Sequence, residues 1–330
     1  MSKEELDIVG IGNAIVDVFA NVDENFLKEN NIEKGIMTLI SEADAEKIYG
    51  QIKPKKEISG GSVANTIFSL SQLNIKTGYI GKISDDKLGD TFTKEMRSAG
   101  TVYKTKPLLK EKEVSTSRCM VMVTPDADRT MCTYLGASSY ITALDVDEDL
   151  IKSASITYLE GYLFDKEEAK KAFKYTAEIA HRVGKKIALS LSDPFCVKRH
   201  REEFLDLVEN YVDILFANEE EIKALYNTDK IPTKMPHYDI LVITRGAKGS
   251  VIASHSEYLE IEPQTNKGKV VDTTGAGDSY AAGFLYGYIK GMDLRKCGEI
   301  ASVVAGEVVS QIGARPQRSL LKILEDKGLI

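Results

Sequence analysis

Short β-branched runs alternate with longer helical patterns along most of this 330-residue chain, and this alternation constrains its fold more than any other feature. In Lys87–Ala99 and Lys166–Val183, apolar side chains recur at helical spacing until a glycine ends the pattern. The alternation predicts an α/β fold with a mainly parallel sheet that helices cover on both faces. The strand-like runs are Asp7–Gly12, Thr77–Ile83, Ile156–Glu160, Lys186–Ser190, Ile214–Ala217 and Ile240–Thr244.

Two regions break this alternation. Val16–Val22 places its polar residues on one side of an extended segment and its apolar residues on the other, as in a half-exposed strand. Ser117–Thr124 and Arg129–Leu135 have the pattern of two strands joined by a hairpin turn. Both regions suit a small β-rich flap on the main sheet.

The composition argues against several classes of protein. The formal charge is −7, and the acidic and basic residues are interspersed, which disfavours a nucleic-acid-binding surface. The four cysteines form no Cys-x-x-Cys pair and the four histidines do not cluster with them, so we expect neither a zinc site nor a disulfide framework. The N-terminal stretch lacks the pattern of a signal peptide, and no apolar run reaches the length of a membrane helix. We therefore expect a cytoplasmic protein that contacts neither membrane nor nucleic acid.

The stretch Val270–Asp278 carries the most specific chemical signal. A β-branched pair leads into a turn in which Gly275 and Gly277 allow unusual backbone angles and clear space for a ligand. A helix is expected from Ser279 onward, and the free N–H groups at a helix start favour an anion. Asp278, placed beside an anion site, suits a base that takes a proton from an alcohol attacking a phosphoryl group. The structural alternative is an ordinary strand–turn–helix junction capped by a polar residue.

Two other glycine-rich strings lie nearer the N-terminus. In Gly60–Asn65 the two glycines permit close approach of a ligand, and Ser62 is predicted to cap the following helix. Asn65 can both donate and accept hydrogen bonds, which suits a sugar hydroxyl. Gly10–Asp17 would turn a buried strand into the flap, but it lacks the third glycine of a dinucleotide fingerprint, and no Walker A string occurs. The alternatives are a plain helix cap for the first string and a solvent-facing strand position for Asp17.

These three strings together resemble signatures of the ribokinase-like (PfkB) family of carbohydrate and nucleoside kinases, and the resemblance extends from Gly10 to about Arg315. It implies ATP-dependent phosphoryl transfer to a primary hydroxyl of a small ribosyl or sugar acceptor, with Mg²⁺ as a second cofactor. It also implies a large α/β nucleotide-binding and catalytic domain, formed by residues 1–13, 59–103 and 138–330. A small β-rich lid over the acceptor would be formed by residues 14–58 and 104–137.

The resemblance implies roles for individual residues. Asp278 would be the catalytic base, and Asp17 would accept hydrogen bonds from two adjacent hydroxyls of the acceptor. The groups that offset charge on the transferred phosphoryl would be the amides of Gly275, Ala276 and Gly277, together with the side chain of Arg129. The other acceptor-binding residues would be Asn13, Gly60, Gly61 and Asn65, with Phe164 and Phe195 against the acceptor's base.

The nucleotide side of the site follows from the same resemblance. Asn218 and Glu221 resemble the family's Asn-x-x-Glu element, which organises Mg²⁺ and its waters, although an acidic first helical turn is the structural alternative. Val303–Arg315 would form one wall of the adenine pocket. Asp272 and Thr274 are candidates for a monovalent cation (K⁺) site that some members have. The nucleotide-binding residues would be Asn218, Thr244, Gly246, Gly249, Thr274 and Ala305.

Within the family, Tyr211–Glu219, Leu189–Phe195 and Gly12–Asp17 look most like adenosine kinases, so the expected reaction converts adenosine to AMP. The signature nevertheless reads Asp-Thr-Thr where the animal-type pattern has Asp-Thr-Asn, which leaves purine specificity open. A sugar kinase of the ribokinase or fructokinase type is one alternative, and a non-catalytic ligand-binding regulatory protein is another. The chain is expected to be a monomer or a homodimer. Candidates for the base pocket are Met37, Leu39, Leu135, Phe164 and Phe195, with core packing as the alternative for each.

Overall fold

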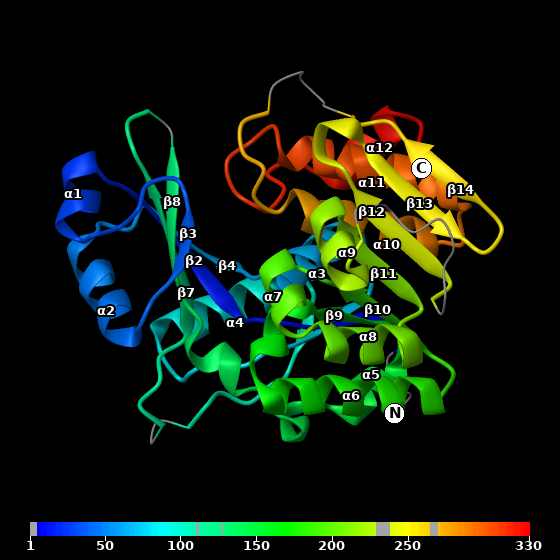
Figure 1. Ribbon diagram of the computed structural model, residues 1–330, viewed down its shortest axis with the longest axis horizontal. Coiled ribbons are helices and arrows are strands. Elements are labelled where there is room, and N and C mark those ends of the chain that lie inside the picture. The colour runs from blue at the N-terminus through cyan, green and yellow to red at the C-terminus, as the bar shows by residue number, and fades with distance from the viewer. Residues whose placement is uncertain (1–4, 110–111, 127, 229–237, 265–269) are drawn as a thin grey trace.

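Figure 1 shows two sheets of unequal size, with helices packed around the larger one. The computed structural model describes residues 5–109, 112–126, 128–228, 238–264 and 270–330. Across the larger sheet the described strands follow the order β14 (Tyr258–Ile261), β13 (Ser250–Ser254), β12 (Ile240–Thr244), β11 (Ile214–Asn218), β10 (Lys186–Ser190), β9 (Ala154–Glu160), β1 (Leu6–Ile11), β5 (Thr77–Ile80) and β6 (Val102–Tyr103). The predicted α/β fold is confirmed.

The larger sheet is parallel from β6 to β12, and β13 and β14 add an antiparallel edge. The sequence pattern did not predict this edge. A parallel crossover needs a dozen or more residues, usually including a helix. Only Arg245–Gly249 separates β12 from β13, so the chain can return only as a hairpin.

Helices cover both faces of the larger sheet. They are α3 (Ser62–Gln72), α4 (Lys87–Ser98), α5 (Glu148–Ser153), α6 (Glu167–Arg182), α7 (Pro194–Arg199), α8 (Arg201–Asn210), α9 (Glu219–Tyr226), α10 (Ala276–Ile289), α11 (Leu294–Val308) and α12 (Leu320–Asp326). Alternate residues of β1 enter two different cores: Ile8 packs with α3, α10 and α11, whereas Val9 packs with α5, α6 and α8. Both side chains are fully buried, as expected for a strand covered on both faces.

The smaller sheet is the predicted β-rich lid. Its described strands follow the order β3 (Met37–Leu39), β8 (Arg129–Tyr134), β7 (Ser117–Val123), β2 (Ile15–Asn21) and β4 (Lys56–Gly60), and its helices are α1 (Glu24–Glu29) and α2 (Glu42–Gln51). Strands β7 and β8 form the expected antiparallel hairpin, although Ala127 in its turn lies outside the described residues. Leu27 of α1 and Ile48 of α2 are buried against this sheet, so one of its faces is covered.

The start of helix α3 differs from the sequence prediction. Its N-cap is Gly61 rather than Ser62, and no side chain caps it. Gly61 has a φ of +99°, and a Cβ at this position would lie 2.1 Å from the carbonyl oxygen of Asn13. The glycine is therefore required because the turn after β1 and the start of α3 approach each other too closely for any side chain.

The start of helix α10 also differs from the prediction. The helix begins at Ala276 rather than Ser279, so Asp278 lies within its first turn. Val270 and Val271 are about half exposed and belong to no strand, because the N–H of Val271 bonds to Val309 in the segment after α11. The anion-site turn is thus braced by a helix neighbour instead of by a sheet.

Gly61→Ala should destabilise the protein by about 1–3 kcal/mol, because alanine adds both a strained backbone conformation and a clash with a carbonyl oxygen. The matched control is Gly50→Ala, since Gly50 lies within helix α2 and a Cβ there meets nothing within 4 Å. The control should be neutral or slightly stabilising. Thermal unfolding of both variants checks the prediction, and equal melting temperatures would contradict it.

Candidate active site

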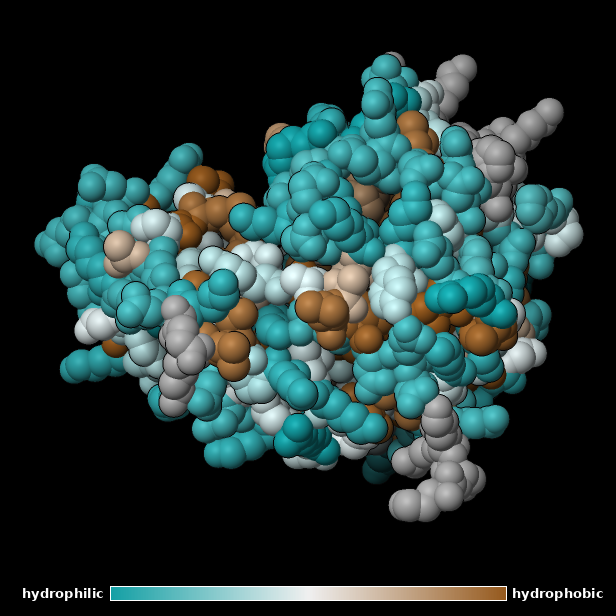
Figure 2. Space-filling view, turned by 90° about the horizontal axis from the view of Figure 1, so that it is seen from below, coloured by the Kyte–Doolittle hydropathy of each residue, from teal (hydrophilic) through white to brown (hydrophobic). Residues whose placement is uncertain are grey.

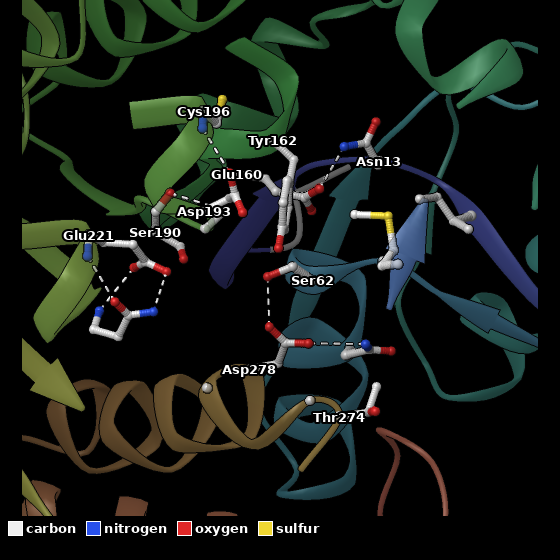
Figure 3. Close-up of a pocket in the computed structure, with 18 of the residues that line it drawn as sticks. Asn13, Ser62, Glu160, Tyr162, Ser190, Asp193, Cys196, Glu221, Thr274 and Asp278 are labelled. Carbon is white, nitrogen blue, oxygen red and sulfur yellow. Dashed lines mark hydrogen bonds between the residues drawn. The ribbon is translucent and has the colours of Figure 1, made fainter. Parts of the chain in front are cut away.

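A cavity of about 820 Å³ lies at the carboxyl ends of the parallel strands, where the lid faces the larger sheet. Ligand sites of open α/β sheets are expected at this edge. Figure 3 shows that its polar residues come from segments far apart in sequence. The cavity gathers most of the predicted site residues, namely Asn13, Asp17, Gly61, Asn65, Phe195, Asn218, Glu221, Thr244, Thr274, Gly275, Ala276, Gly277 and Asp278.

Asp278 is held by the first turn of helix α3. Its carboxylate accepts hydrogen bonds from Ser62 Oγ at 2.6 Å and from Asn65 Nδ2 at 3.1 Å. Burial raises the pKa of Asp278 from 3.8 to about 6, although both hydrogen bonds act to lower it. A carboxylate with this pKa is ionised at neutral pH and is a stronger base than an exposed aspartate, which suits proton abstraction from an alcohol.

The amino end of α10 is open toward the cavity. The N–H of Ala276 donates to Thr273 at 3.1 Å, so it is already engaged, in contrast to its predicted role. The N–H of Gly277 has no acceptor among the described residues, and a Cβ at Gly277 would meet nothing within 4 Å. Gly275 has a different task, because its φ is +73° and a Cβ there would lie 2.4 Å from the Cβ of Ala314. Gly277 therefore leaves room for a ligand, whereas Gly275 permits the turn.

Asp17 faces the cavity from strand β2 and is packed against Gly60. A Cβ at Gly60 would lie 2.5 Å from Asp17 Oδ2, so this glycine does not line the cavity but clears space for the carboxylate. Burial raises the pKa of Asp17 from 3.8 to about 7. The positive charge of Arg315 opposes this shift, and the negative charges of Asp278 and Glu95 add to it.

Glu160 and Tyr162 also line the cavity, and the sequence reasoning assigned them no role. Glu160, at the end of β9, is buried and accepts hydrogen bonds from Asn13 Nδ2 at 2.7 Å and from the N–H of Val63 at 2.9 Å. It therefore ties the end of β1 to the start of α3, and burial raises its pKa to about 7. The sequence signal that could have identified Glu160 is a charged residue at the carboxyl end of an apolar strand. Tyr162 points into the cavity (Figure 3) and carried no such signal.

Asn218 and Glu221 cap helix α9 reciprocally. Glu221 Oε1 and Oε2 accept from Asn218 Nδ2 at 2.7 Å and from the N–H of Asn218 at 2.9 Å, and Asn218 Oδ1 accepts from the N–H of Glu221. Burial raises the pKa of Glu221 to about 7. In the described part of the chain no three His, Cys, Asp or Glu side chains are arranged to hold a metal ion. The pair thus fits Mg²⁺ through the ion's waters, since each carboxylate oxygen keeps a second lone pair.

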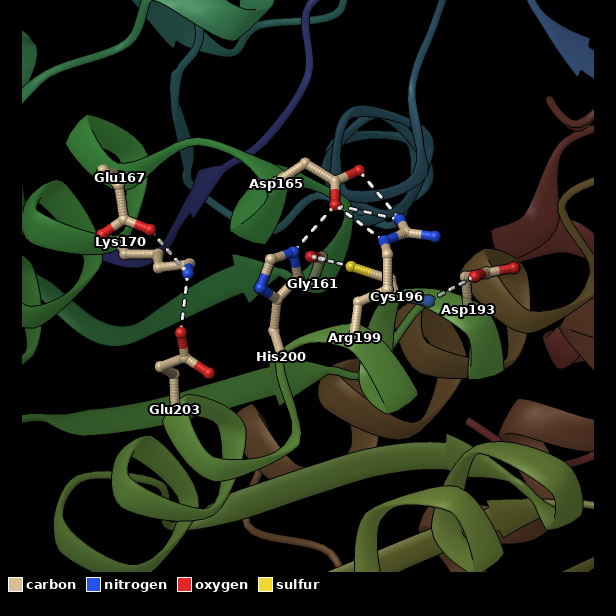
Figure 4. Close-up of polar contacts among 9 residues, drawn as sticks. All are labelled: Gly161, Asp165, Glu167, Lys170, Asp193, Cys196, Arg199, His200 and Glu203. Atoms are coloured by element: carbon tan, nitrogen blue, oxygen red, sulfur yellow. Dashed lines mark hydrogen bonds and ion pairs between the residues drawn. The ribbon is translucent and has the colours of Figure 1, made fainter.

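Helix α7 forms a wall of the cavity, and charged contacts hold it in place (Figure 4). Asp165, in the turn after β9, accepts two hydrogen bonds from Arg199 Nη2, at 2.9 and 3.0 Å from its two oxygens, and it contacts His200 Nε2 at 2.9 Å. Asp193 caps the helix through the N–H of Cys196 at 2.7 Å. Phe195 on this wall is 68% exposed, so its ring is free to contact a ligand.

Two predicted roles need correction. Phe164 does not face the cavity: it is buried and stacks on Phe204 with ring centroids 3.9 Å apart, because its side of the turn after β9 faces the α6–α8 core. Arg129 does not line the cavity either, since its guanidinium pairs with the carboxylate of Asp272. This pair connects the lid hairpin to the anion-site turn.

The Asp272 carboxylate already has three partners. Besides Arg129, it accepts hydrogen bonds from the N–H groups of Thr274 at 3.0 Å and Gly313 at 2.7 Å. Burial alone would raise its pKa, but these partners hold it below its ordinary value. A K⁺ site at Asp272 and Thr274 therefore stays a prediction without support from this geometry.

The remaining nucleotide-side residues lie outside the cavity lining. Gly249 has a φ of +79°, and a Cβ there would lie 2.0 Å from the carbonyl oxygen of Ile261, so the β12–β13 turn requires it. Gly246 also has a positive φ but faces open space. Ala305 packs against the core from α11. Arg315, the last residue of the stretch expected to form a wall of the adenine pocket, is buried under Asn65.

Residues 36–319 match the pfkB family carbohydrate kinase domain, which covers most of the chain. The chain belongs to this family. Membership makes it a phosphotransferase with an alcohol acceptor, and it implies ATP as the phosphoryl donor and typically Mg²⁺. None of the helices in the described residues is long and apolar enough to cross a membrane.

Relatives within the family differ in their acceptors. The nucleoside kinase of Methanothermobacter thermautotrophicus is 27% identical over 95% of this chain and 92% of its own length. The crystal structure of a probable sugar kinase from Rhizobium etli is 41% identical, covers 99% of this chain and 100% of its own, and has a TM-score of 0.90. The crystal structure of adenosine kinase from Sinorhizobium meliloti is also 41% identical, covers 98% of this chain and 99% of its own, and has a TM-score of 0.87. The likeness supports the kinase class without choosing the acceptor.

The raised pKa of Asp278 predicts a pH-dependent cost to stability. The folded protein holds this proton more tightly than the unfolded chain, so the stabilising contribution is complete below pH 3.8 and is lost as pH rises through about 6. Asp278→Asn cannot ionise, so it should raise the melting temperature at about pH 8 and change it little at about pH 3.5, below the unfolded-state pKa.

The control for this measurement is Asp90→Asn, because Asp90 is exposed in the first turn of α4. It should give the same small change at both pH values. A shift of equal size at both pH values for Asp278→Asn would exclude charge burial as the cause.

Proposed function

We propose that this chain transfers the γ-phosphoryl group of ATP to the 5′-hydroxyl of adenosine. The observation that carries the proposal is the placement of Asp278 in the first turn of α10, bonded to Ser62 and Asn65 of α3. The amino end of α10 thus presents an N–H group to an anion, while the carboxylate of Asp278 in the same turn faces the acceptor side of the cavity. This arrangement suits a base beside a phosphoryl group.

The chemistry is a direct in-line transfer. Asp278 takes the proton of the primary hydroxyl, the hydroxyl oxygen bonds to the γ-phosphorus, and the bond to the ADP oxygen breaks. The N–H of Gly277 and the dipole of α10 offset the charge that develops on the phosphoryl oxygens. When bound, Mg²⁺ supplies further positive charge, and Asn218 and Glu221 would hold its waters.

The lid side of the cavity supports an acceptor with a large apolar group. Met37 and Leu39 of β3 are 46% and 53% exposed, and both line the cavity together with Leu135. Phe195 offers an aromatic ring on the α7 wall. A free sugar would leave this apolar surface exposed to water, whereas the purine of a nucleoside would bury it. We therefore favour adenosine over a ribokinase- or fructokinase-type acceptor.

We propose the domain division that the sequence resemblance implies. The lid comprises residues 14–58 and 104–137, and it closes over a larger domain of residues 1–13, 59–103 and 138–330. Closure would exclude water from the phosphoryl group and so limit ATP hydrolysis. A cytoplasmic location and a monomeric or homodimeric state stay predictions from the sequence.

Asp278→Asn should lower kcat by about 10²–10⁴ while ATP binding changes little, because the amide cannot take a proton but preserves the size of the side chain. ADP release from Mg·ATP, with adenosine, inosine, guanosine, ribose, fructose and fructose 6-phosphate as acceptors, checks both the base and the acceptor. An unchanged kcat would remove Asp278 from the role of base. Preference for a sugar would keep the kinase and overturn adenosine, and no turnover with any acceptor would favour the non-catalytic alternative.

Leu39→Asn should raise the KM for adenosine by about tenfold, since loss of apolar contact with a base costs about 1–3 kcal/mol. The KM for ATP should not change, because Leu39 lies on the lid side of the cavity. Leu144→Asn is the control, since Leu144 is 98% exposed and does not line the cavity. Equal adenosine KM values for both variants would rule out the lid as the base pocket.

A further inference from the structure

Arg315 is a buried cation directly beneath the acceptor side of the cavity. It follows helix α11, and it is 8% exposed. Its Nε donates to Asn65 Oδ1 at 3.3 Å, and its Nη1 lies 3.6 Å from a carboxylate oxygen of Glu95 in α4. Its guanidinium carbon lies 4.1 Å from the ring centroid of Phe68. Arg315 thus contacts both α3 and α4, but it does not line the cavity itself.

The contact between Arg315 and Asn65 determines the orientation of the Asn65 side-chain amide. A guanidinium can only donate hydrogen bonds, so the side facing Arg315 must be the amide oxygen. The amide nitrogen then faces Asp278, to which it donates at 3.1 Å. Without Arg315 the amide could rotate and turn its oxygen toward the carboxylate, which would replace a hydrogen bond by repulsion.

Arg315 also has an electrostatic effect on the pKa of Asp17. The negative charges of Glu95 from α4 and Asp278 from α10 act on Asp17 of β2, and Arg315 is the cation that opposes them. The other titratable groups in electrostatic contact with Asp17 or Arg315 are the buried thiol of Cys119 on β7 and the buried phenol of Tyr79 on β5. Burial raises the pKa of Asp17 to about 7 even with Arg315 present, so loss of Arg315 would raise it further.

We propose that Arg315 is a positioning residue for phosphoryl transfer, which orients the Asn65 amide toward Asp278 and favours the ionised form of Asp17 for binding the acceptor's hydroxyls. This inference rests on the proposed kinase reaction, but it concerns the acceptor side of the cavity. It makes acceptor binding, rather than ATP binding, depend on a side chain outside the cavity.

The principal test is Arg315→Met, which keeps the apolar contact with Phe68 and removes the charge. The KM for the acceptor should rise by about tenfold or more, and kcat should fall by about tenfold, while the KM for ATP stays within about twofold. The acceptor KM of the wild type should rise as pH falls through about 7, because a protonated Asp17 accepts fewer hydrogen bonds. In Arg315→Met this midpoint should move upward by about one pH unit or more.

Two further variants separate charge from packing. Arg315→Lys restores the positive charge but not the planar guanidinium, so it should recover the wild-type midpoint more completely than kcat. Glu95→Gln removes a negative charge near Asp17, so it should move the midpoint downward, opposite to Arg315→Met. This opposite shift keeps the test decisive even where Arg315→Met fails to fold.

The outcomes distinguish this proposal from the proposed function. Turnover of any acceptor by the wild type establishes the kinase, and the variants are then compared with that acceptor. Acceptor binding by calorimetry gives the same pH midpoints without turnover. A wild-type midpoint in Glu95→Gln, or a loss in Arg315→Met that is equal at every pH, would show that the charges around Asp17 do not control acceptor binding and would overturn the proposal.

Discussion

The site depends on the hydrogen bonds from Ser62 and Asn65 to Asp278, which join residues 216 and 213 positions apart in the sequence. They bring the first turns of α3 and α10 together at one point on the sheet edge. Because the two helix starts meet there, a carboxylate and the free N–H groups of a helix end can face the same ligand. Glu160 extends this junction to β1 and β9 by accepting from Asn13 and from the N–H of Val63.

Glycines are as important to this junction as the hydrogen bonds, because they leave the space that a side chain would fill. Gly61 passes against the backbone of Asn13, and Gly60 leaves space for the carboxylate of Asp17. Gly12 does the same for Glu160, since a Cβ there would lie 2.4 Å from its Oε2. In each case a methyl group would displace the carbonyl or carboxylate that the glycine touches. The glycine-rich strings thus serve the packing of the site as well as close approach of the ligand.

The sequence predicted most of the fold because strand alternation and helical spacing are local signals. It also predicted which segments meet at the cavity, since parallel strands share one carboxyl edge. It could not predict the antiparallel edge at β13, which depends on a short connection, or the direction in which Phe164 points. The roles of Glu160 and Arg315 were missed for a common reason. Their importance arises from burial beside groups from other parts of the chain, and no spacing within one segment encodes it.

The arrangement of charge explains why the site needs Arg315. Burial raises the pKa values of Asp17, Glu160 and Asp278, so each carboxylate is held above its ordinary range in the folded protein. Such groups make poor stabilising elements but good bases and hydrogen-bond acceptors. If nothing opposed burial, Asp17 would be mostly protonated at physiological pH and would accept fewer hydrogen bonds from adjacent hydroxyls. The guanidinium of Arg315, behind Asn65, opposes this effect of burial without entering the cavity, so a larger fraction of Asp17 is ionised than burial alone would allow.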